Sequence, residues 1–376
     1  MNRVQCVDVF RVPCGSPGDL RGVQTLIDQG ALQASQIVAV MGKTEGNGCV
    51  NDHTRDFAAT SWCNFLAPHL ACSPAQVAER VALVMSGGTE GVLSPHFTVF
   101  ARGWAPAPGH GQKRLVVGIA HTRDFLPEEI GRRAQIVATA DATRAAMADA
   151  GITDESDVHF VQVKCPLLTA AKVQAALARG HEPVTHDAYE SMGFSRGASA
   201  LGVAVALGEV PLARAEDAAV LSDWSLHSTH ASASAGIELD HNVVIVLGEA
   251  AGAASGVRIG HTVMRDALDA ASVRLLLREH FGIDPDSPVL QERLVNLLAK
   301  AEASPDGRVR GERHTMLNDS DIHATRHARA AVGAVLASVV GQTALYVSGG
   351  AEHQGPAGGG PVAVILRVES EGVAHV

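Results

Sequence analysis

The sequence lacks the features that mark several large classes of protein. Its 40 Asp and Glu outnumber its 30 Lys and Arg, which gives a net charge of −10. The basic residues are also scattered, so we expect neither nucleic acid nor an anionic membrane as a partner. The six Cys contain no C-x-x-C pair and the first residues contain no apolar signal region, which favours a reducing cytoplasm. The 18 His show no H-E-x-x-H or comparable spacing, so a catalytic zinc is not indicated.

Uncharged stretches long enough to cross a bilayer are also absent, except at residues 330–351. That stretch contains Ser338, Gln342, Thr343 and several Gly. We therefore interpret it as a buried helix that runs into a strand. With 376 residues, 46% of them hydrophobic, the chain can bury a large core, and its length suggests two or three units.

The sequence does contain three related segments. Each reads Ser, then Gly or Ala, then Gly, then any residue, then Glu, and they begin at Ser86, Ser234 and Ser348. One Ser-Gly-Gly would mean little, but three copies spread along the chain predict three copies of one unit. We place the units at residues 1–106, 113–250 and 256–376, with joins in stretches rich in Gly, Pro or Ala.

Each unit also presents a Lys, an Arg and the Ser in the same order. The three sets are Lys43, Arg55 and Ser86; Lys164, Arg196 and Ser234; and Lys300, Arg326 and Ser348. Each of these arginines directly follows a hydroxyl residue, in the pairs Thr-Arg, Ser-Arg and Thr-Arg. The spacings differ, as expected of diverged repeats whose loops vary in length.

Apolar runs and their periodicity predict alternating strands and helices. Strands are expected at residues 4–12, 37–41, 81–85, 97–100, 115–120, 159–163, 243–247, 257–259, 345–347 and 362–366. Helices are expected at residues 18–30, 54–70, 128–150, 198–207, 264–279, 289–300 and 328–340. Lys43 and Lys164 therefore follow buried strands, whereas Lys300 is placed at the end of a helix.

Three such units packed about a pseudo-threefold axis would surround a central site with nine polar groups. Arg offers planar donors to carbonyl oxygens, and Ser-Gly-Gly offers a hydroxyl and open backbone N–H groups. The site would suit a small ligand whose hydrogen-bonding groups repeat three times. The alternative is that these are ordinary turn residues and surface cations, an interpretation that fits one set better than three in the same order.

Ser becomes a nucleophile only beside a base, and a Lys can serve when burial keeps its amine neutral. Lys43 and Lys300 each have a Glu two residues further on, at Glu45 and Glu302. Lys164 has Pro166 there and lies in an apolar run. We therefore predict that Lys164 and Ser234 form the working pair, while the other Lys and Ser residues bind and polarise the substrate.

Three other stretches of the sequence have alternative interpretations. Residues 193–197 match G-x-S-x-G, but that nucleophile turn needs a buried strand before it, and residues 186–191 are polar. Gly42-Lys43-Thr44 resembles the end of a phosphate loop, but Ile37 stands where the first Gly is required. Residues 352–361 form either a plain connection or a loop whose carbonyls, with a carboxylate such as Glu302, hold a hard cation.

At this level of detail the chain resembles the cyanuric acid hydrolase and barbiturase family of ring-opening amidohydrolases. The resemblance is carried by residues 40–48, 85–93, 160–168, 190–201, 231–238 and 348–361. It implies an α+β fold of three homologous repeats about a pseudo-threefold axis. It further implies a central β-barrel-like core with outer helices, and a homotetramer.

The resemblance also implies a reaction and a set of site residues. The reaction is hydrolysis of cyanuric acid to carboxybiuret, which loses carbon dioxide to give biuret. Ser234 would be the nucleophile and Lys164 its base. The ring would be held by Arg55, Arg196, Arg326, Ser86, Gly87, Ser234, Ala235, Ser348 and Gly349, with Lys43 and Lys300. The alternatives are a barbiturase and a silent protein that binds a small ring.

The same resemblance implies a structural cation and no organic cofactor. A magnesium or calcium ion would be held by Glu302, Ala351, Gln354, Gly355, Pro356 and Gly359. It would shape the loop that carries Ser348 rather than activate water.

Overall fold

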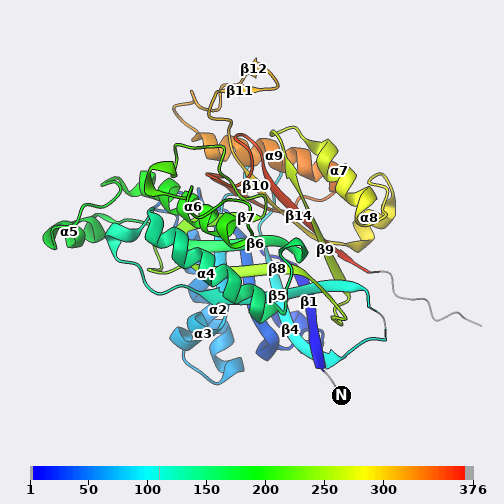
Figure 1. Cartoon of the computed structure of the whole chain (residues 1–376). Coiled ribbons are helices and arrows are strands. Elements are labelled where there is room, and N and C mark those ends of the chain that lie inside the picture. Colours follow the sequence, from blue (N-terminus) through cyan, green and yellow to red (C-terminus); the bar gives the residue numbers. More distant parts are fainter. Residues whose placement is uncertain (1–2, 110, 369–376) are drawn as a thin grey trace, which may run out of the picture.

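The computed structural model describes residues 3–109 and 111–368 and shows a mixed α/β fold built on three four-stranded sheets (Figure 1). The first sheet contains β1 (Arg3–Pro13), β4 (His96–Pro106), β2 (Ile37–Thr44) and β3 (Ala82–Gly87), in that order. The second contains β5 (Lys113–His121), β8 (Val243–Ala251), β6 (Val158–Pro166) and β7 (Ala231–Gly236). The third contains β9 (Val257–Met264), β14 (Gly360–Arg367), β10 (Leu294–Ala301) and β13 (Tyr346–Gly349).

The three sheets share one topology. In each, the first and second strands along the chain run antiparallel to the fourth, and the second runs parallel to the third. The second strand is irregular near its start in every case, between Ile37 and Ala39, Val158 and Phe160, and Leu294 and Asn296. Equal strand order and an equally placed irregularity indicate that one structural pattern is used three times.

The parallel strand pairs place each Lys opposite a Ser. Lys43 is in register with Ser86, Lys164 with Ser234, and Lys300 with Ser348. Side chains directly opposite each other in neighbouring strands share a face of the sheet. The register therefore places each Lys opposite its Ser although, for Lys164 and Ser234, the two residues are 70 positions apart in the chain.

Helices cover the outer faces of the sheets (Figure 1). The first unit has α1 (Arg21–Asp28), α2 (His53–Leu70) and α3 (Pro74–Arg80), and the second has α4 (Arg133–Ala150), α5 (Ala170–Ala178) and α6 (Ala188–Ala206). The third has α7 (Ala270–Glu279), α8 (Pro288–Arg293), α9 (Ala324–Val340) and a short hairpin of β11 (Arg308–Val309) and β12 (Glu312–Arg313). Single 3-10 turns occupy Ala34–Gln36, Pro127–Glu129, Glu155–Asp157 and Asp217–Ala219.

Sequence signals explain where several helices begin and end. The Asp52 side chain accepts a hydrogen bond from the backbone N–H of Thr54 and so caps α2. Ser73 and Gln76 form a reciprocal capping box at the start of α3. Helix α4 ends at Gly151, whose φ of 74° suits a residue without a side chain. The cap at Asp52 fixes the start of α2, which is the helix that carries Arg55.

The inner faces of all three sheets meet in one apolar core. Met41, Phe160, Ile245, Ile259 and Leu298 are among its fully buried members. Burying a side chain of this size stabilises a fold by about 1.5–3 kcal/mol. The shared core therefore holds the three Lys–Ser strand pairs together at one end of the sheets.

Two expectations about the fold are wrong. The central β-barrel-like core is not a closed barrel, because within the described ranges the sheets stay separate and their edge strands do not join into one continuous ladder. The helix expected at residues 289–300 ends at Arg293, and strand β10 follows. The run Leu294–Ala301 is buried throughout, and periodicity alone does not separate a fully buried strand from a buried helix.

The uncharged stretch at residues 330–351 is a helix followed by a strand, as predicted. It contains most of α9 and the whole of β13. No helix in the described ranges is long and apolar enough to cross a membrane.

Candidate functional site

Three serine hydroxyls converge where the sheets meet. Ser86 Oγ donates a hydrogen bond to Ser348 Oγ at 3.2 Å, and Ser234 Oγ lies 3.1 Å from Ser348 Oγ. All three side chains are buried. Each serine lies near the end of the edge strand of a different sheet. The packing of the sheets therefore creates a cluster that no single unit could form.

The three predicted lysines are buried beside these serines. Lys43 Nζ donates to Ser86 Oγ at 3.2 Å, and Lys300 Nζ donates to Ser348 Oγ at 3.3 Å. Lys300 also reaches the carbonyl of Ala233 in the second sheet at 2.8 Å. Lys164 Nζ instead donates to the carbonyl of Met85 in the first sheet at 3.0 Å. The lysines therefore tie neighbouring sheets together as well as facing the serines.

Burial lowers the pKa of all three lysines, because a charge is poorly solvated in the interior. The pKa of Lys43 falls well below its ordinary value, and that of Lys300 falls to about 7. For Lys164, a 2.9 Å ion pair with Glu238 opposes the effect of burial. A neutral amine is thus accessible at this site near neutral pH.

The reason for singling out Lys164 was therefore wrong. It was expected to lack a carboxylate neighbour, yet it makes a direct ion pair with Glu238, and Glu45 beside Lys43 is exposed. Glu238 is the last residue of the second Ser-x-Gly-x-Glu segment. The prediction rested only on the residue two positions after each Lys. It could not include Glu238, which reaches Lys164 only in the folded chain.

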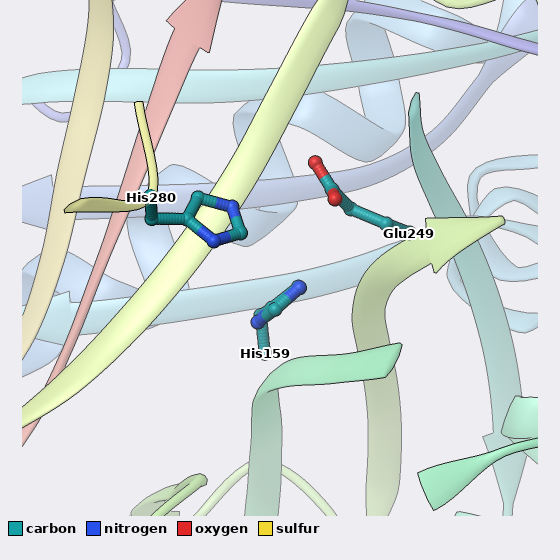
Figure 2. Close-up of side chains that lie close together, drawn as sticks. All are labelled: His159, Glu249 and His280. Atoms are coloured by element: carbon teal, nitrogen blue, oxygen red, sulfur yellow. The ribbon is translucent and has the colours of Figure 1, made fainter. Parts of the chain in front are cut away.

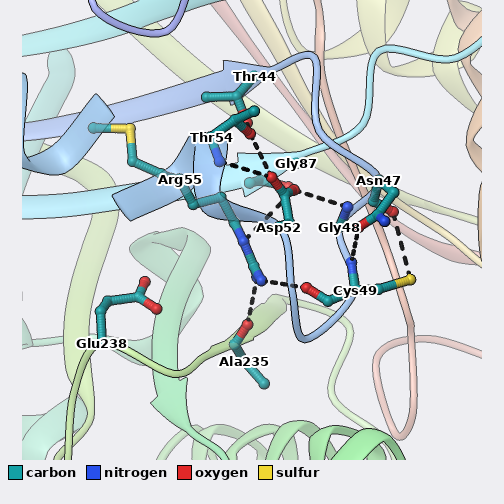
Figure 3. A network of polar contacts seen from close by, with 12 residues as sticks. Thr44, Asn47, Gly48, Cys49, Asp52, Thr54, Arg55, Gly87, Ala235 and Glu238 are labelled. Carbon is teal, nitrogen blue, oxygen red and sulfur yellow. Dashed lines mark hydrogen bonds and ion pairs between the residues drawn. The ribbon is translucent and has the colours of Figure 1, made fainter. Parts of the chain in front are cut away.

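Arg55 is held at the edge of the serine cluster by a network around the start of α2 (Figure 3). Its Nη1 donates to the carbonyl of Ala235 at 2.9 Å, and its Nη2 donates to the carbonyl of Cys49 at 2.6 Å. The Asp52 carboxylate lies 3.7 Å from Arg55 Nε and accepts from the N–H of Gly48 at 2.8 Å. The network joins the first unit to the second at the residue after Ser234.

Two further arginines make paired hydrogen bonds to the Glu of a Ser-x-Gly-x-Glu segment. Arg196 donates to both oxygens of Glu352, at 2.8 and 2.5 Å, which raises the pKa of the guanidinium despite its burial. Arg329 donates to both oxygens of Glu90, at 2.7 and 2.6 Å. Such paired contacts fix a guanidinium in position. Each pair joins two units, because Arg196 on α6 belongs to the second unit and Glu352 to the third, while Arg329 on α9 belongs to the third and Glu90 to the first.

The middle Gly of these segments makes room for the arginines. A Cβ added at Gly88 would lie 2.4 Å from Arg329 Nε, and one added at Gly350 would lie 2.6 Å from Arg196 Nε. Both glycines also have positive φ, 103° and 78°, where other residues are strained. In the first and third segments, the Gly of the Ser-x-Gly-x-Glu pattern is therefore required by a guanidinium packed against the chain.

A small pocket opens above the serine hydroxyls. Its lining residues are Gly48, Arg55, Ser86, Gly87, Met192, Arg196, Ser234, Ala235, Arg329, Ser348 and Gly349. The structure thus brings together most of the residues predicted to bind a substrate. The lysines lie below the pocket floor, in hydrogen-bond contact with the serines or the residues beside them.

The structure does not bring Arg326 to this pocket. Its side chain is 37% exposed and lies in a neighbouring hollow, with a 3.1 Å contact to Glu90. Arg329, one helical turn further along α9, is 3% exposed and lines the pocket instead. Matching Thr-Arg contexts selected Arg326, and the sequence carried no comparable local signal for Arg329.

Of the predicted cation ligands, Glu302, Ala351 and Gly355 line a cavity of about 510 Å³ that Arg196 also borders. Glu302 is partly buried, and its oxygens accept from the N–H of Ala303 at 2.9 Å and of Ala351 at 2.8 Å. Burial and the nearby Glu352 raise the pKa of Glu302 to about 7. Gln354 uses its side-chain oxygen to accept from the N–H of Ala233 at 2.7 Å, which leaves a second lone pair on that oxygen for a cation.

A second group of potential metal ligands lies outside the pocket, where His159, Glu249 and His280 face one another (Figure 2). Arg258 donates to both Glu249 oxygens, at 3.0 and 3.1 Å, and its Nη2 lies 3.2 Å from His280 Nε2. The guanidinium already supplies the positive charge that a metal ion would bring. We interpret this group as a structural ion pair surrounded by histidines.

These histidines should make the fold sensitive to acid. Burial, with neighbouring histidines, lowers the pKa of His159 to about 2 and that of His261 to about 3. In the unfolded chain these histidines have a pKa near 6.5. As the pH falls, the unfolded chain therefore binds protons before the folded chain does. Below pH 6.5 the free energy of unfolding should therefore fall by about 1.4 kcal/mol per pH unit for each such His.

Denaturant unfolding of a His159→Gln variant between pH 7.5 and 4.5 tests this expectation. The variant should lose stability less steeply than the wild type below pH 6.5, while the two curves run parallel above pH 7. Equal slopes at acidic pH would show that His159 is not a source of the acid sensitivity.

Comparisons with known proteins agree with the geometry of the site. Residues 8–367 match the family model described as amidohydrolase ring-opening protein. The chain is 63% identical to a cyanuric acid amidohydrolase of Pseudomonas sp. (strain ADP), with 96% of this chain and 99% of that one covered. It is 60% identical to a cyanuric acid amidohydrolase of Bradyrhizobium diazoefficiens, with 97% and 99% covered.

Solved structures give the same result. One solved structure is of a cyanuric acid hydrolase described as an evolutionary innovation by structural concatenation. It is 62% identical to this chain and superimposes with a TM-score of 0.93, covering 97% of this chain and 100% of that one. Another, of cyanuric acid hydrolase from A. caulinodans, is 49% identical with a TM-score of 0.89 and the same coverage. The chain belongs to the family of ring-opening amidohydrolases.

Proposed function

We propose that this chain hydrolyses one ring amide of cyanuric acid, a six-membered ring of three carbonyls alternating with three N–H groups. The observation that carries the proposal is the equal register of three Lys–Ser pairs, in which the hydroxyls of Ser86 and Ser234 lie 3.2 and 3.1 Å from that of Ser348. Arg55, Arg196 and Arg329 surround the same pocket. The names of the relatives support the same substrate.

The three units are proposed to be homologous repeats about a pseudo-threefold axis, spanning residues 1–106, 113–250 and 256–376. The shared sheet order and the shared irregularity in β2, β6 and β10 support this arrangement. A ligand with threefold hydrogen-bonding groups would meet similar side chains in each third of such a pocket. The homotetramer and the cytoplasmic location stay predictions.

In the proposed first step, Ser234 Oγ attacks a ring carbonyl carbon while its proton passes to neutral Lys164 Nζ. Burial favours the neutral amine, and the register across β6 and β7 places the two residues opposite each other. The C–N bond then breaks, the ring nitrogen takes the proton from Lys164, and the opened chain remains bonded to Ser234 Oγ as an ester-like acyl group.

In the second step, water attacks the same carbonyl carbon and gives a proton to Lys164. The bond to Ser234 Oγ breaks, and the serine recovers a proton from Lys164. The product is carboxybiuret, which loses carbon dioxide to give biuret. The arginines and the backbone N–H groups beside the serines would hold the ring oxygens, and Lys43 and Lys300 would polarise them through Ser86 and Ser348.

Incubation with cyanuric acid and, separately, with barbituric acid tests the function. Loss of ring absorbance with cyanuric acid, and formation of biuret, is the expected result. Faster loss with barbituric acid would favour a barbiturase, which acts on a ring with CH2 in place of one N–H. Binding of either ring without turnover would favour a silent binding protein, and loss with neither would reject the enzyme.

A structural magnesium or calcium ion is proposed beside Glu302. The residues present fit a hard cation, because Glu302 and Glu352 are two partly buried carboxylates near one guanidinium, Arg196. The carbonyls of Ala351 and Pro356 each accept one backbone hydrogen bond within the loop, which leaves a second lone pair free. With Gln354, Gly355 and Gly359, these oxygens would hold the ion, which would offset the carboxylate charge and shape the Ser348 loop.

Removal of this ion should lower both thermal stability and turnover. After treatment with a chelator, we expect Tm to fall by about 4 °C or more, because a bound ion stabilises the folded chain alone. Magnesium or calcium should restore both properties. A Glu302→Gln variant should no longer respond to the chelator. Unchanged Tm and turnover in protein shown by atomic emission to be metal-free would reject the site.

A further inference from the structure

Tyr346, close to the serine cluster, is a residue at which the three units differ. It lies on β13 two residues before Ser348, so its side chain is on the same face of the strand. The corresponding residues are Val84 on β3 and Ser232 on β7. A large polar ring therefore enters the space beneath three otherwise similar serines from one unit only.

The hydroxyl of Tyr346 is in an unusual position. The side chain is fully buried, and within the described ranges Tyr346 Oη has no hydrogen-bond partner. Burial raises the pKa of the phenol, and the nearby hydroxyls of Ser234 and Ser86 oppose this rise, although neither meets the geometry of a hydrogen bond. Lys43 Nζ lies 5.9 Å from the ring centroid. An unsatisfied buried hydroxyl lowers stability, so its presence calls for a functional explanation.

The hydrogen bonds among the serines suggest that explanation. A serine hydroxyl can donate once and accept twice. Lys43 donates to Ser86, Ser86 donates to Ser348, and Lys300 also donates to Ser348. Ser348 then has its own proton left for Ser234, 3.1 Å away. This order makes Ser234 the end of the chain of hydroxyls and leaves one of its two acceptor positions unfilled.

We propose that Tyr346 is a positioning residue for Ser234: when a ring occupies the pocket, the Tyr346 hydroxyl, which has no partner among the described residues, donates its proton to the remaining acceptor position of Ser234. With Ser348 and Tyr346 both donating, the single proton of Ser234 is directed to Lys164. The inference rests on the proposed function and adds a reason why Ser234, and not Ser86 or Ser348, is activated. Val84 carries no hydroxyl, and the hydroxyl of Ser232 already donates to Gln162 at 2.8 Å, so neither can replace Tyr346.

A Tyr346→Phe variant tests the proposal, because it removes the hydroxyl and keeps the ring. We expect kcat for cyanuric acid to fall about tenfold, as expected for one lost hydrogen bond, with KM within about twofold of the wild type. Tm should be unchanged or higher, because the lost hydroxyl was unsatisfied. Thr143→Val removes a buried hydroxyl on α4 that donates to the carbonyl of Thr139, outside the pocket, and should leave kcat unchanged.

A second variant tests the proposal if Tyr346→Phe is unstable. Ser348→Ala removes the other donor to Ser234 and should also lower kcat more than it raises KM. Wild-type kcat in either variant overturns the proposal, as does a fall in the kcat of Tyr346→Phe matched by a loss of Tm. A wild-type protein that leaves cyanuric acid intact overturns the proposed function and this inference with it. An active wild type with a fully active Tyr346→Phe variant overturns the role of Tyr346 alone.

Discussion

Replacing Ser234 by Ala is expected to lower kcat by at least about a thousandfold, because the variant has no oxygen with which to attack the ring. Ser86→Ala and Ser348→Ala should each lose about tenfold to a hundredfold, as expected for a missing hydrogen bond to the substrate or to a neighbouring hydroxyl. The three changes are chemically identical and occur at similar places in similar sheets. Their unequal effects would therefore identify the nucleophile.

The comparison is needed because the lysine contacts in the structure do not favour Ser234 as the nucleophile. Lys43 and Lys300 donate directly to Ser86 and Ser348, whereas the contacts of Lys164 are to Met85 and Glu238. Single-turnover assays with mass spectrometry should reveal an adduct on the peptide that contains Ser234. An inactive Ser86→Ala variant beside a fully active Ser234→Ala variant would move the nucleophile to the first unit.

The strands that carry the site could be predicted from the sequence because their apolar runs are local signals. Residues 37–41 and 159–163 were predicted as strands, and both lie inside β2 and β6, which end just beyond Lys43 and Lys164. The equivalent strand before Lys300 was missed, because residues 289–300 combine a short helix with a buried strand. The repeat itself was the better guide there, since a third Lys–Ser pair requires a strand at the same place.

The charges around the site could not be predicted in the same way, because their partners come from different units. The Glu that closes each Ser-x-Gly-x-Glu segment was visible in the sequence but had no assigned role. In the structure Glu90 pairs with Arg329, Glu352 with Arg196, and Glu238 with Lys164. The Glu90 and Glu352 pairs cross between units, and their formation depends on how the units pack. Spacing along the chain carries no information about such contacts.

The largest effect among the arginines of the third unit is expected at Arg329. Arg329→Lys keeps the charge but loses the paired contacts to Glu90 and the planar donor group that faces the pocket. We expect kcat/KM for cyanuric acid to fall about tenfold to a hundredfold, which corresponds to the loss of a charged hydrogen bond. The guanidinium would otherwise stabilise charge that develops on a ring oxygen during attack.

Arg326→Lys is the matched control, because Arg326 is on the same helix and contacts the same carboxylate from a more exposed position. It should change kcat/KM by less than about threefold, as expected when a partly exposed ion pair is altered. The Thr-Arg context in the sequence favours Arg326 as the substrate-binding arginine, whereas the pocket favours Arg329. A large loss in Arg326→Lys beside a small one in Arg329→Lys would support the sequence pattern and show that Arg329 serves mainly to hold Glu90. The opposite order would mean that the third arginine of the pocket is supplied one helical turn beyond the repeated motif.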